Sequence, residues 1–328
     1  MKIEGRKVFG FPGQGRATVG VGMGANLLLH EDPQIKEIAR RTYEEADDTL
    51  GTSLSKIFLR DPEKTLAEQE GLLFQQENSQ PATLVTGVAA DRVLINFGII
   101  PSVVLGHSVA GAAAGVAAGA LQFKDAVLLT KKRGEFMAQA ASNGVENGNP
   151  GRMYAVLGMT ADEVEEICRE AGGYLANRNT PFQNIVSADA ETMKRVVELI
   201  DQKKRENTER KIRYLDLKVT VAAHSPLMAD ARDNLASYLQ TIPITDPELP
   251  IISGISGEYM TTAKDIETSL IDGVVNGVDW VRAIEKAEPE VFIHVGPGKV
   301  LADFMKEIDE GVTVYTSDEL LDTHPSTC

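Results

Sequence analysis

The chain has 328 residues, of which 43% are hydrophobic, so it can form one large domain with a smaller insert, or two domains. Its formal net charge of −15, from 33 basic and 48 acidic residues, argues against binding to nucleic acid or to an anionic membrane surface. No run approaches the roughly 20 apolar residues of a membrane span, and the two distant cysteines, Cys168 and Cys328, indicate a reducing cytoplasm rather than a disulfide framework.

Along the first half of the chain, short apolar runs alternate with helical patterns, which is typical of an α/β fold with parallel strands. In chain order we expect a strand at 7–11, helices at 33–50 and 80–97, a strand at 102–105, helices at 110–120 and 125–141, and a Gly/Asn-rich loop at 142–151. Further strands are expected near Ile251 and Val291. These segments predict a discontinuous large domain at 1–151 and 220–317.

The intervening segment has the pattern of a separate small unit. We expect strands at 152–157, 184–187 and 213–221 and helices at 160–171 and 191–204. Thr160 and Glu163 have the spacing of a capping box at the start of the first of these helices. The alternation predicts a ferredoxin-like subdomain at 152–219, and the polar composition of 318–328 predicts a loose tail.

The segment around Ser108 predicts a nucleophile. An apolar strand leads into Gly106, His107 and Ser108, and a helix of very small residues follows at once. This is the strand–turn–helix context of a nucleophile elbow, in which the first amides of the helix point at the serine oxygen. The alternative is a buried turn in which Ser108 only caps the helix.

A serine nucleophile needs a general base, and histidine is the usual one. Of the five histidines, His224 is favoured because it ends a strand-like run, where the sites of α/β proteins collect. A core histidine is the alternative. His107 is next to Ser108 at a sharp turn, so we expect its side chain to pack elsewhere.

Arg133 falls on the otherwise apolar face of the helix expected at 125–141. A buried guanidinium is unfavourable unless an anion pairs with it. That anion could be an internal Asp or Glu, or it could be the carboxylate of a substrate, which arginine binds with two parallel hydrogen bonds.

Eight motifs in chain order resemble those of the malonyl-CoA:acyl carrier protein acyltransferase family of fatty acid and polyketide synthesis, and the resemblance covers nearly the whole chain. The motifs are F-P-G-Q-G at 11–15, Q-P-A at 80–82, G-H-S at 106–108, R-G-E-F-M at 133–137, N-T-P-F-Q at 179–183, H-S-P-L-M at 224–228, N-G-V-D-W at 276–280 and G-P-G-K-V-L at 296–301. The family usually has Glu after G-H-S-x-G, whereas this chain has Ala110 and Gly111 in the last two of these positions.

The resemblance implies an α/β-hydrolase-like large domain with a parallel sheet, an inserted ferredoxin-like subdomain, and the site between them. It also implies a malonyl or substituted malonyl group carried from coenzyme A to an acyl carrier protein, with no cofactor beyond the coenzyme A thioester and no metal. The implied roles are Ser108 as nucleophile, His224 as base, the amides of Gln14 and Val109 as oxyanion hole, Arg133 as carboxylate receptor, Gln80 and Gln183 as acyl pocket, and the backbone of Asp279 as the group that orients His224.

Two other functions remain open from the sequence. One is an acyl hydrolase that clears carrier proteins, against which Arg133 argues because a neutral acyl chain does not need a buried cation. The other is a non-catalytic subunit that binds a carrier protein, against which Ser108, His224 and Gln14 argue. For docking of an acidic carrier protein we predict a basic patch, with a solvated charged loop as the alternative; its residues are Lys203, Lys204, Arg205, Arg210, Lys211 and Arg213.

Overall fold

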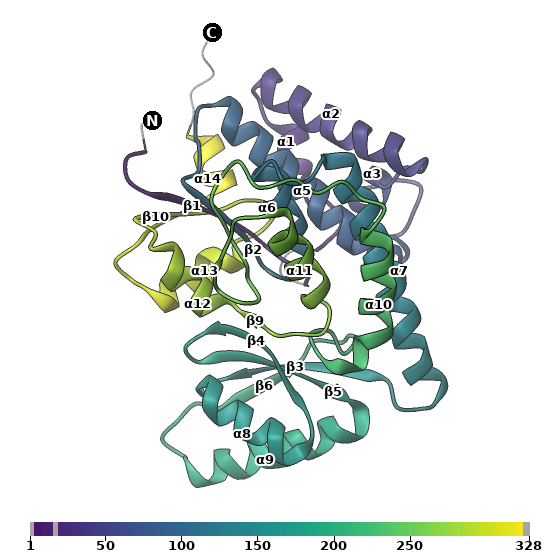
Figure 1. The fold of residues 1–328 in the computed structure, drawn as a ribbon, viewed down its shortest axis with the longest axis vertical. Helices are drawn as coiled ribbons and strands as arrows, with labels where there is room; N and C mark the ends of the chain where they lie inside the picture. The colour runs from purple at the N-terminus through teal and green to yellow at the C-terminus, as the bar shows by residue number, and fades with distance from the viewer. Residues whose placement is uncertain (1–2, 16–18, 324–328) are drawn as a thin grey trace.

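A computed structural model of the chain describes residues 3–15 and 19–323, and Figure 1 shows a large α/β unit above a smaller one. The large unit is built on a six-stranded sheet in the order β11-β10-β1-β2-β7-β8. These strands are β1 (Lys7–Phe11), β2 (Val103–Gly106), β7 (Ile251–Ile252), β8 (Tyr259–Met260), β10 (Val291–His294) and β11 (Thr313–Thr316). All neighbouring pairs are parallel except β7 with β8, so the carboxyl ends of β1 and β2 lie side by side.

Alternate residues of the central strands pack on opposite faces of this sheet, as the pleat requires. Phe9 and Phe11 join the larger core, whereas Val8, Val103 and Leu105 join a second core on the other face. The helices of the larger core are α1 (Ala25–Leu29), α2 (Pro33–Leu50), α3 (Ser55–Phe58), α4 (Leu66–Leu73), α5 (Gln76–Asn96), α6 (Gly111–Ala117), α7 (Phe123–Glu146), α10 (Ala229–Leu239), α11 (Ala263–Asp272) and α14 (Ser317–Asp322). The second core is covered by α12 (Trp280–Ala287) and α13 (Val300–Ile308). Helices on both faces explain why the central strands β1, β2 and β10 are mostly apolar.

The small unit has a five-stranded sheet in the order β6-β3-β5-β4-β9, with α8 (Ala161–Ala171) and α9 (Ala190–Glu206) on the face turned away from the large unit (Figure 1). The strands are β3 (Gly151–Leu157), β4 (Tyr174–Thr180), β5 (Gln183–Asp189), β6 (Arg213–Asp216) and β9 (Val278–Asp279). Its first four strands and two helices follow the ferredoxin-like order β-α-β-β-α-β. The fifth strand, β9, comes from the part of the chain that has returned to the large unit, and it pairs in parallel with β4. The two units are therefore joined by sheet hydrogen bonds.

Local sequence signals account for several helix ends. The side chain of Asp32 accepts a hydrogen bond from the amide of Gln34 at the start of α2, and Gly51 ends this helix at φ 64°. The predicted capping box of Thr160 and Glu163 is confirmed at the start of α8. These signals act within one turn of the chain, which is why they can be predicted without the fold.

The structure confirms the α/β fold class and corrects several details of the sequence prediction. The strand predicted at 213–221 ends at Asp216 as β6, so His224 does not follow a strand but a segment without regular secondary structure. The loop predicted at 142–151 begins later, because α7 continues to Glu146. Strand β4 was missed because it has polar residues, namely Asn177, Arg178 and Asn179, in its centre. The loose tail predicted at 318–328 is wrong for 318–322, which lie in α14 with Leu320 and Leu321 buried, and its last residues, 324–328, lie outside the described residues. No helix in the described part of the chain is long and apolar enough to cross a membrane.

Candidate active site

Strand β2 ends in a turn that cannot contain a side chain at Gly106. A Cβ atom at this position would lie 2.1 Å from the carbonyl oxygen of Ala110. Ser108 follows at φ 57°, a left-handed conformation that is strained for any residue with a side chain. A short 3₁₀ turn (Ser108–Ala110) then leads into α6. This is the geometry of a nucleophile elbow, and it projects the Ser108 side chain from the carboxyl end of a central strand.

The predicted serine and histidine meet, although they are 116 residues apart in sequence. Ser108 Oγ lies 2.8 Å from His224 Nε2. His224 is 4% exposed and also has a left-handed backbone, at φ 58°. Burial, with a smaller contribution from the charge of Arg133, lowers the pKa of His224 to about 3, so the imidazole is neutral at pH 7. A neutral imidazole can accept the proton of the serine hydroxyl.

The carbonyl that orients His224 belongs to Asn276, so the prediction of Asp279 is wrong. His224 Nδ1 lies 3.0 Å from the Asn276 oxygen, and the His224 amide donates to the carbonyl of Val274 at 3.1 Å. A proton on Nδ1 that is donated to a carbonyl leaves Nε2 as the acceptor for the serine. Asp279 instead caps α12 through the amide of Arg282 and lies 3.6 Å from the guanidinium of Arg178.

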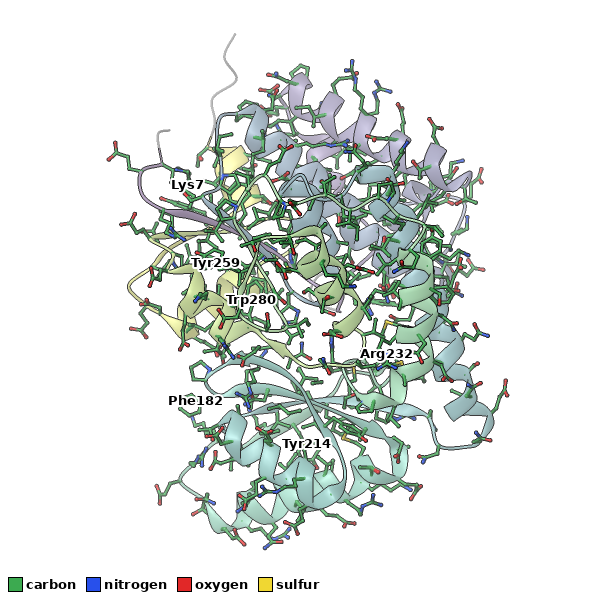
Figure 2. All side chains as sticks on the ribbon, viewed as in Figure 1. Lys7, Phe182, Tyr214, Arg232, Tyr259 and Trp280 are labelled. Carbon is green, nitrogen blue, oxygen red and sulfur yellow. The ribbon has the colours of Figure 1, made fainter. Side chains whose placement is uncertain are left out.

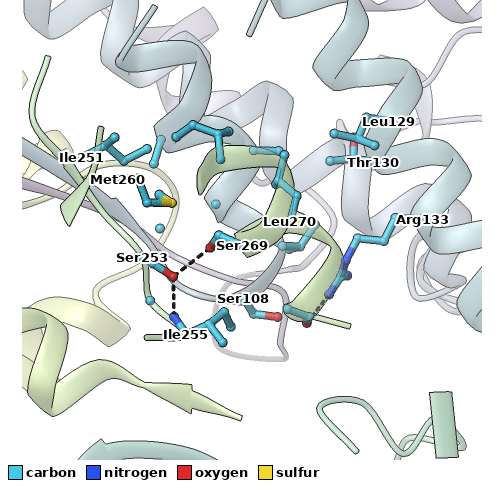
Figure 3. Close-up of a pocket in the computed structure, with 18 of the residues that line it drawn as sticks. Ser108, Leu129, Thr130, Arg133, Ile251, Ser253, Ile255, Met260, Ser269 and Leu270 are labelled. Carbon is cyan, nitrogen blue, oxygen red and sulfur yellow. Dashed lines mark hydrogen bonds between the residues drawn. The ribbon is translucent and has the colours of Figure 1, made fainter. Parts of the chain in front are cut away.

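Arg133 is 7% exposed on α7 and points toward the same end of a cavity as Ser108 (Figure 3). Its Nη1 donates to Gln80 Oε1 at 2.8 Å and its Nη2 donates to the Gly273 carbonyl at 3.2 Å. Within residues 3–15 and 19–323, no carboxylate lies within 4.0 Å of this guanidinium, so these residues do not provide the internal salt bridge considered from the sequence. Burial lowers the pKa of Arg133 to about 10. The site therefore holds a buried cation, with free donors, that lacks an anion.

A chain of amide side chains connects Arg133 with the loop after β1. Gln76 Oε1 accepts hydrogen bonds from Gln14 Nε2 at 2.6 Å and from Gln80 Nε2 at 3.1 Å. The same loop packs on the nucleophile, since a Cβ atom at Gly13 would lie 3.4 Å from the Cβ of Ser108. Gln80 is thus placed beside the carboxylate receptor, and Gln14 beside the elbow, on which Val109 is buried. Gln76 was not predicted, because nothing in the sequence indicates that it pairs with a residue 62 positions away.

The cavity at Ser108 is small, because the space that the centre of a water molecule could occupy in it is about 30 Å³. Ser108, Val109, Arg133 and Gly273 are among its lining residues, and most of the others are apolar. Neither glutamine predicted for the acyl pocket is among them. Gln80 hydrogen-bonds Arg133, which does line the cavity, whereas Gln183 begins β5 and pairs with Leu157 in the small sheet.

His107 turns away from the serine, as expected from its position in the turn. Its Nε2 lies 2.9 Å from Asn179 Oδ1, and its ring packs at 5.4 Å from that of Trp280. Burial lowers the pKa of His107. Trp280 lies close to where the two units meet (Figure 2). Phe182, which comes from the same predicted motif as Asn179, is instead 56% exposed and lies on the outside of the small unit. His107 therefore links the elbow to the small sheet.

The predicted basic patch lies in the small unit, away from Ser108. Lys203, Lys204 and Arg205 form the last turn of α9, on the outer face of the small sheet (Figure 1). Arg210 differs from the prediction, because its guanidinium pairs with Glu163 at 2.6 Å and its charge is balanced within the chain. The remaining members, Lys211 and Arg213, are exposed at the start of edge strand β6.

Comparison with known proteins gives one consistent result. Residues 8–316 match the model of the acyl transferase domain family. The malonyl CoA-acyl carrier protein transacylase of Bacillus subtilis (strain 168) is 36% identical over 319 residues, which cover 94% of this chain and 93% of that protein. The solved structure of the malonyl CoA-acyl carrier protein transacylase of Coxiella burnetii has a TM-score of 0.84 and 32% identity, covering 97% of this chain and 96% of that one.

A second solved structure contains a partner protein. It is a malonyl-transacylase in complex with a type II PKS acyl-carrier protein, with a TM-score of 0.83 and 28% identity over 98% of this chain and 100% of that one. The similarity thus extends over whole chains and includes both units of the fold.

Proposed function

Since this chain belongs to the malonyl-CoA:acyl carrier protein transacylase family of acyltransferases, we propose that it carries a malonyl group from coenzyme A to an acyl carrier protein through an ester on Ser108. The observation that supports this most strongly is the hydrogen-bonded Ser108–His224 pair together with Arg133, which is buried without a carboxylate partner among the described residues and lines the same cavity as Ser108. A malonyl thioester has an electrophilic carbonyl at one end and a carboxylate at the other. The cavity offers a partner for each.

In the first half-reaction, His224 Nε2 takes the proton of Ser108 as the serine oxygen bonds to the thioester carbon. The carbonyl oxygen becomes an oxyanion, which the amides of Gln14 and Val109 stabilise. The C–S bond then breaks, and coenzyme A leaves as a thiol that takes the proton from His224. The product is a malonyl ester on Ser108.

The second half-reaction is the reverse with a different thiol. The thiol of the carrier protein gives its proton to His224 and attacks the ester carbon, and the C–O bond to Ser108 breaks as the serine recovers a proton. Two thiols that use one site in turn predict ping-pong kinetics. Throughout, Arg133 and Gln80 hold the carboxylate end in place, which supplies the orientation of the reacting carbonyl.

Three further parts of the proposal concern the surroundings of the reaction. The mechanism uses no cofactor besides the coenzyme A thioester. A cytoplasmic location is supported by the free, buried thiol of Cys168, which is usual in reducing compartments. The pathway is fatty acid or polyketide synthesis, and the solved relative bound to a type II PKS carrier protein supports polyketide synthesis.

Intact-protein mass spectrometry tests the proposal and its alternatives together. The protein is incubated with malonyl-CoA, with and without a holo carrier protein. We expect a malonyl adduct on the enzyme that moves to the carrier, and no adduct on Ser108→Ala. Release of free malonate as the product of each turnover would instead identify a hydrolase. Binding of the carrier without any malonyl adduct would identify a non-catalytic subunit. An adduct that persists in Ser108→Ala would refute the assignment of the nucleophile.

A further inference from the structure

The loop that follows β1 contacts the nucleophile elbow on one side and α5 on the other. Gly13 allows the first contact, because a Cβ atom there would lie 2.7 Å from the His107 carbonyl oxygen. On the other side, Gln14 Nε2 donates to Gln76 Oε1 at 2.6 Å, and the Ser79 hydroxyl donates to Gln14 Oε1 at 3.4 Å. The second distance is long for a hydroxyl donor. Of these two partners, Gln76 therefore holds the Gln14 side chain more firmly.

Gln76 reaches this loop because the first turn of α5 packs directly against α7. A Cβ atom at Gly134 of α7 would lie 2.6 Å from the Cα atom of Glu77, so a side chain at Gly134 would force the two helices apart. Gly134 follows Arg133 in the chain. The start of α5 is thereby fixed beside the carboxylate receptor, with Gln76 one helical turn before Gln80 on the same face of α5.

The two glutamines that bond to Gln76 depend on it to different degrees. The Arg133 guanidinium has only donors, so Gln80 turns its oxygen toward Arg133, at 2.8 Å, and its nitrogen toward Gln76, at 3.1 Å. Gln80 is fully buried and its nitrogen also lies 3.4 Å from Met137 Sδ, so other contacts hold it in place. Gln14 is only half-buried and has the shorter bond to Gln76. Loss of Gln76 should therefore release Gln14 and leave Gln80 at the receptor.

We propose that Gln76 is a positioning residue for the oxyanion hole. By anchoring the Gln14 side chain to α5, it holds the backbone amide of Gln14 at the oxygen of the reacting carbonyl. The inference rests on the proposed function, in which this amide and that of Val109 stabilise the oxyanion. Gln76 acts through Gln14 and not by contact with the substrate, so its effect should not depend on which acyl group is transferred.

The expected effect is on kcat and is the same for different acyl groups. Removal of a whole oxyanion donor lowers kcat about 10²–10³-fold, and a donor that is kept but displaced should cost less, so we expect Gln76→Leu to lower kcat about 5–20-fold. KM for malonyl-CoA should change by less than about twofold. Every thioester develops the same oxyanion, so kcat/KM for acetyl-CoA should fall by the same factor. Gln80→Leu, beside Arg133, should instead lower the ratio of malonyl to acetyl transfer.

A double-mutant cycle tests whether Gln76 acts through Gln14. Gln14→Leu keeps the backbone amide and removes the side chain that Gln76 holds. Adding Gln76→Leu to this variant should change kcat by less than about twofold, because the contact is already lost. A substitution that only weakens the fold would add its effect in full. The matched control is Gln202→Leu on the exposed face of α9, which should change neither kcat nor the malonyl to acetyl ratio.

The rates are measured by intact mass spectrometry, as acylation of the enzyme by each thioester and as transfer to a holo carrier protein. A malonyl to acetyl ratio that falls in Gln76→Leu would show that Gln76 acts on the carboxylate end. Full additivity with Gln14→Leu would show that it does not act through Gln14. Either result, or an unchanged kcat, would overturn the inference. Absence of acylation of the wild-type protein by malonyl-CoA would instead overturn the proposed function.

Discussion

Arg133 in the large unit and Arg210 in the small unit are held in opposite ways. The Arg210 side chain is 35% exposed, and its guanidinium makes two hydrogen bonds to the carboxylate of Glu163, at 2.6 and 2.9 Å, which raise its pKa. Arg133 is buried, bonds to the neutral oxygens of Gln80 and Gly273, and has its pKa lowered by burial.

The difference shows how a structural cation is distinguished from one that waits for a ligand. The charge of Arg210 is balanced by the chain, so it needs nothing further and fixes the start of α8 against the loop before β6. The charge of Arg133 is not balanced by any described residue, yet it lies at a cavity beside a serine–histidine pair. Both arginines were candidate functional residues in the sequence, and only their surroundings separate them.

The largest effect is expected at the buried site that contains Arg133, Ser108 and His224. His224→Ala removes the group that accepts the serine proton, and we expect kcat for transfer to fall by roughly 10⁴-fold or more. The fold should persist, which circular dichroism can check. If the variant keeps more than about a hundredth of the activity, His224 is not the base.

The buried site should also make the protein sensitive to acid. Burial lowers the pKa of His224 to about 3 and that of His294 to about 4, whereas an unfolded histidine titrates near 6.5. The unfolded state therefore takes up protons first, so the stability these groups contribute is complete above pH 6.5 and is lost as the pH falls toward 4.

For one such histidine the loss between pH 7.5 and 5 is about 2 kcal/mol. Urea unfolding at both pH values measures this loss in the wild type and in His294→Gln, a site away from the reaction. We expect the drop to be smaller in the variant by about that amount. Equal drops would show that His294 does not cause the acid sensitivity.

Breaking the chain of amide side chains between Gln14 and Arg133 should lower the rate of malonyl transfer less than removing Gln14 or Arg133 itself. Gln76→Leu removes the oxygen that Gln14 and Gln80 share, and we expect kcat/KM for malonyl-CoA to fall about 5–20-fold. Gln76→Glu keeps an acceptor oxygen but adds a negative charge one amide away from Arg133, so it should not restore the rate for a substrate that carries a carboxylate. Gln202→Leu on the exposed face of α9 is the control. Identical kinetics for Gln76→Leu and Gln202→Leu would remove Gln76 from the site.

The smallest effect is expected at the exposed basic patch of the small unit, which also contains Arg210. Lys203, Lys204 and Arg205 form no ion pair within 4.0 Å among the described residues. Changing all three to Glu should raise KM for the carrier protein about 3–10-fold, more at low salt, and leave KM for malonyl-CoA unchanged. An unchanged carrier KM at low salt would show that the carrier docks elsewhere.

The site residues that could be predicted from the sequence are those whose own side chains break a local pattern. Arg133 interrupts an apolar helix face, and Ser108 follows a strand that ends in Gly106. The carbonyl of Asn276 could not be predicted in this way, because every residue has a carbonyl and its direction depends on the path of the chain from 273 to 276. Gln76 could not be predicted either, since its partners are set by packing of α5 against the loop after β1.

The same distinction applies to the fold. The central strands of the large sheet are mostly apolar because helices cover both faces, so β1, β2 and β10 are predictable from composition. Strand β4 carries Asn177 and Asn179 toward His107, and this polar character hid it. A segment whose function opposes its structural propensity is the one that sequence patterns miss.

The most direct test of the central claim is the ratio of kcat/KM for malonyl-CoA to that for acetyl-CoA. An acetyl group leaves the buried Arg133 unpaired, at a cost of roughly 3–5 kcal/mol, so we expect the wild-type ratio to be in the hundreds or more. Arg133→Ala should bring it close to one, Arg133→Lys should restore it only in part, and Arg210→Ala should leave it unchanged. A wild-type ratio near one, or a ratio that Arg133→Ala does not move, would contradict Arg133 as the carboxylate receptor.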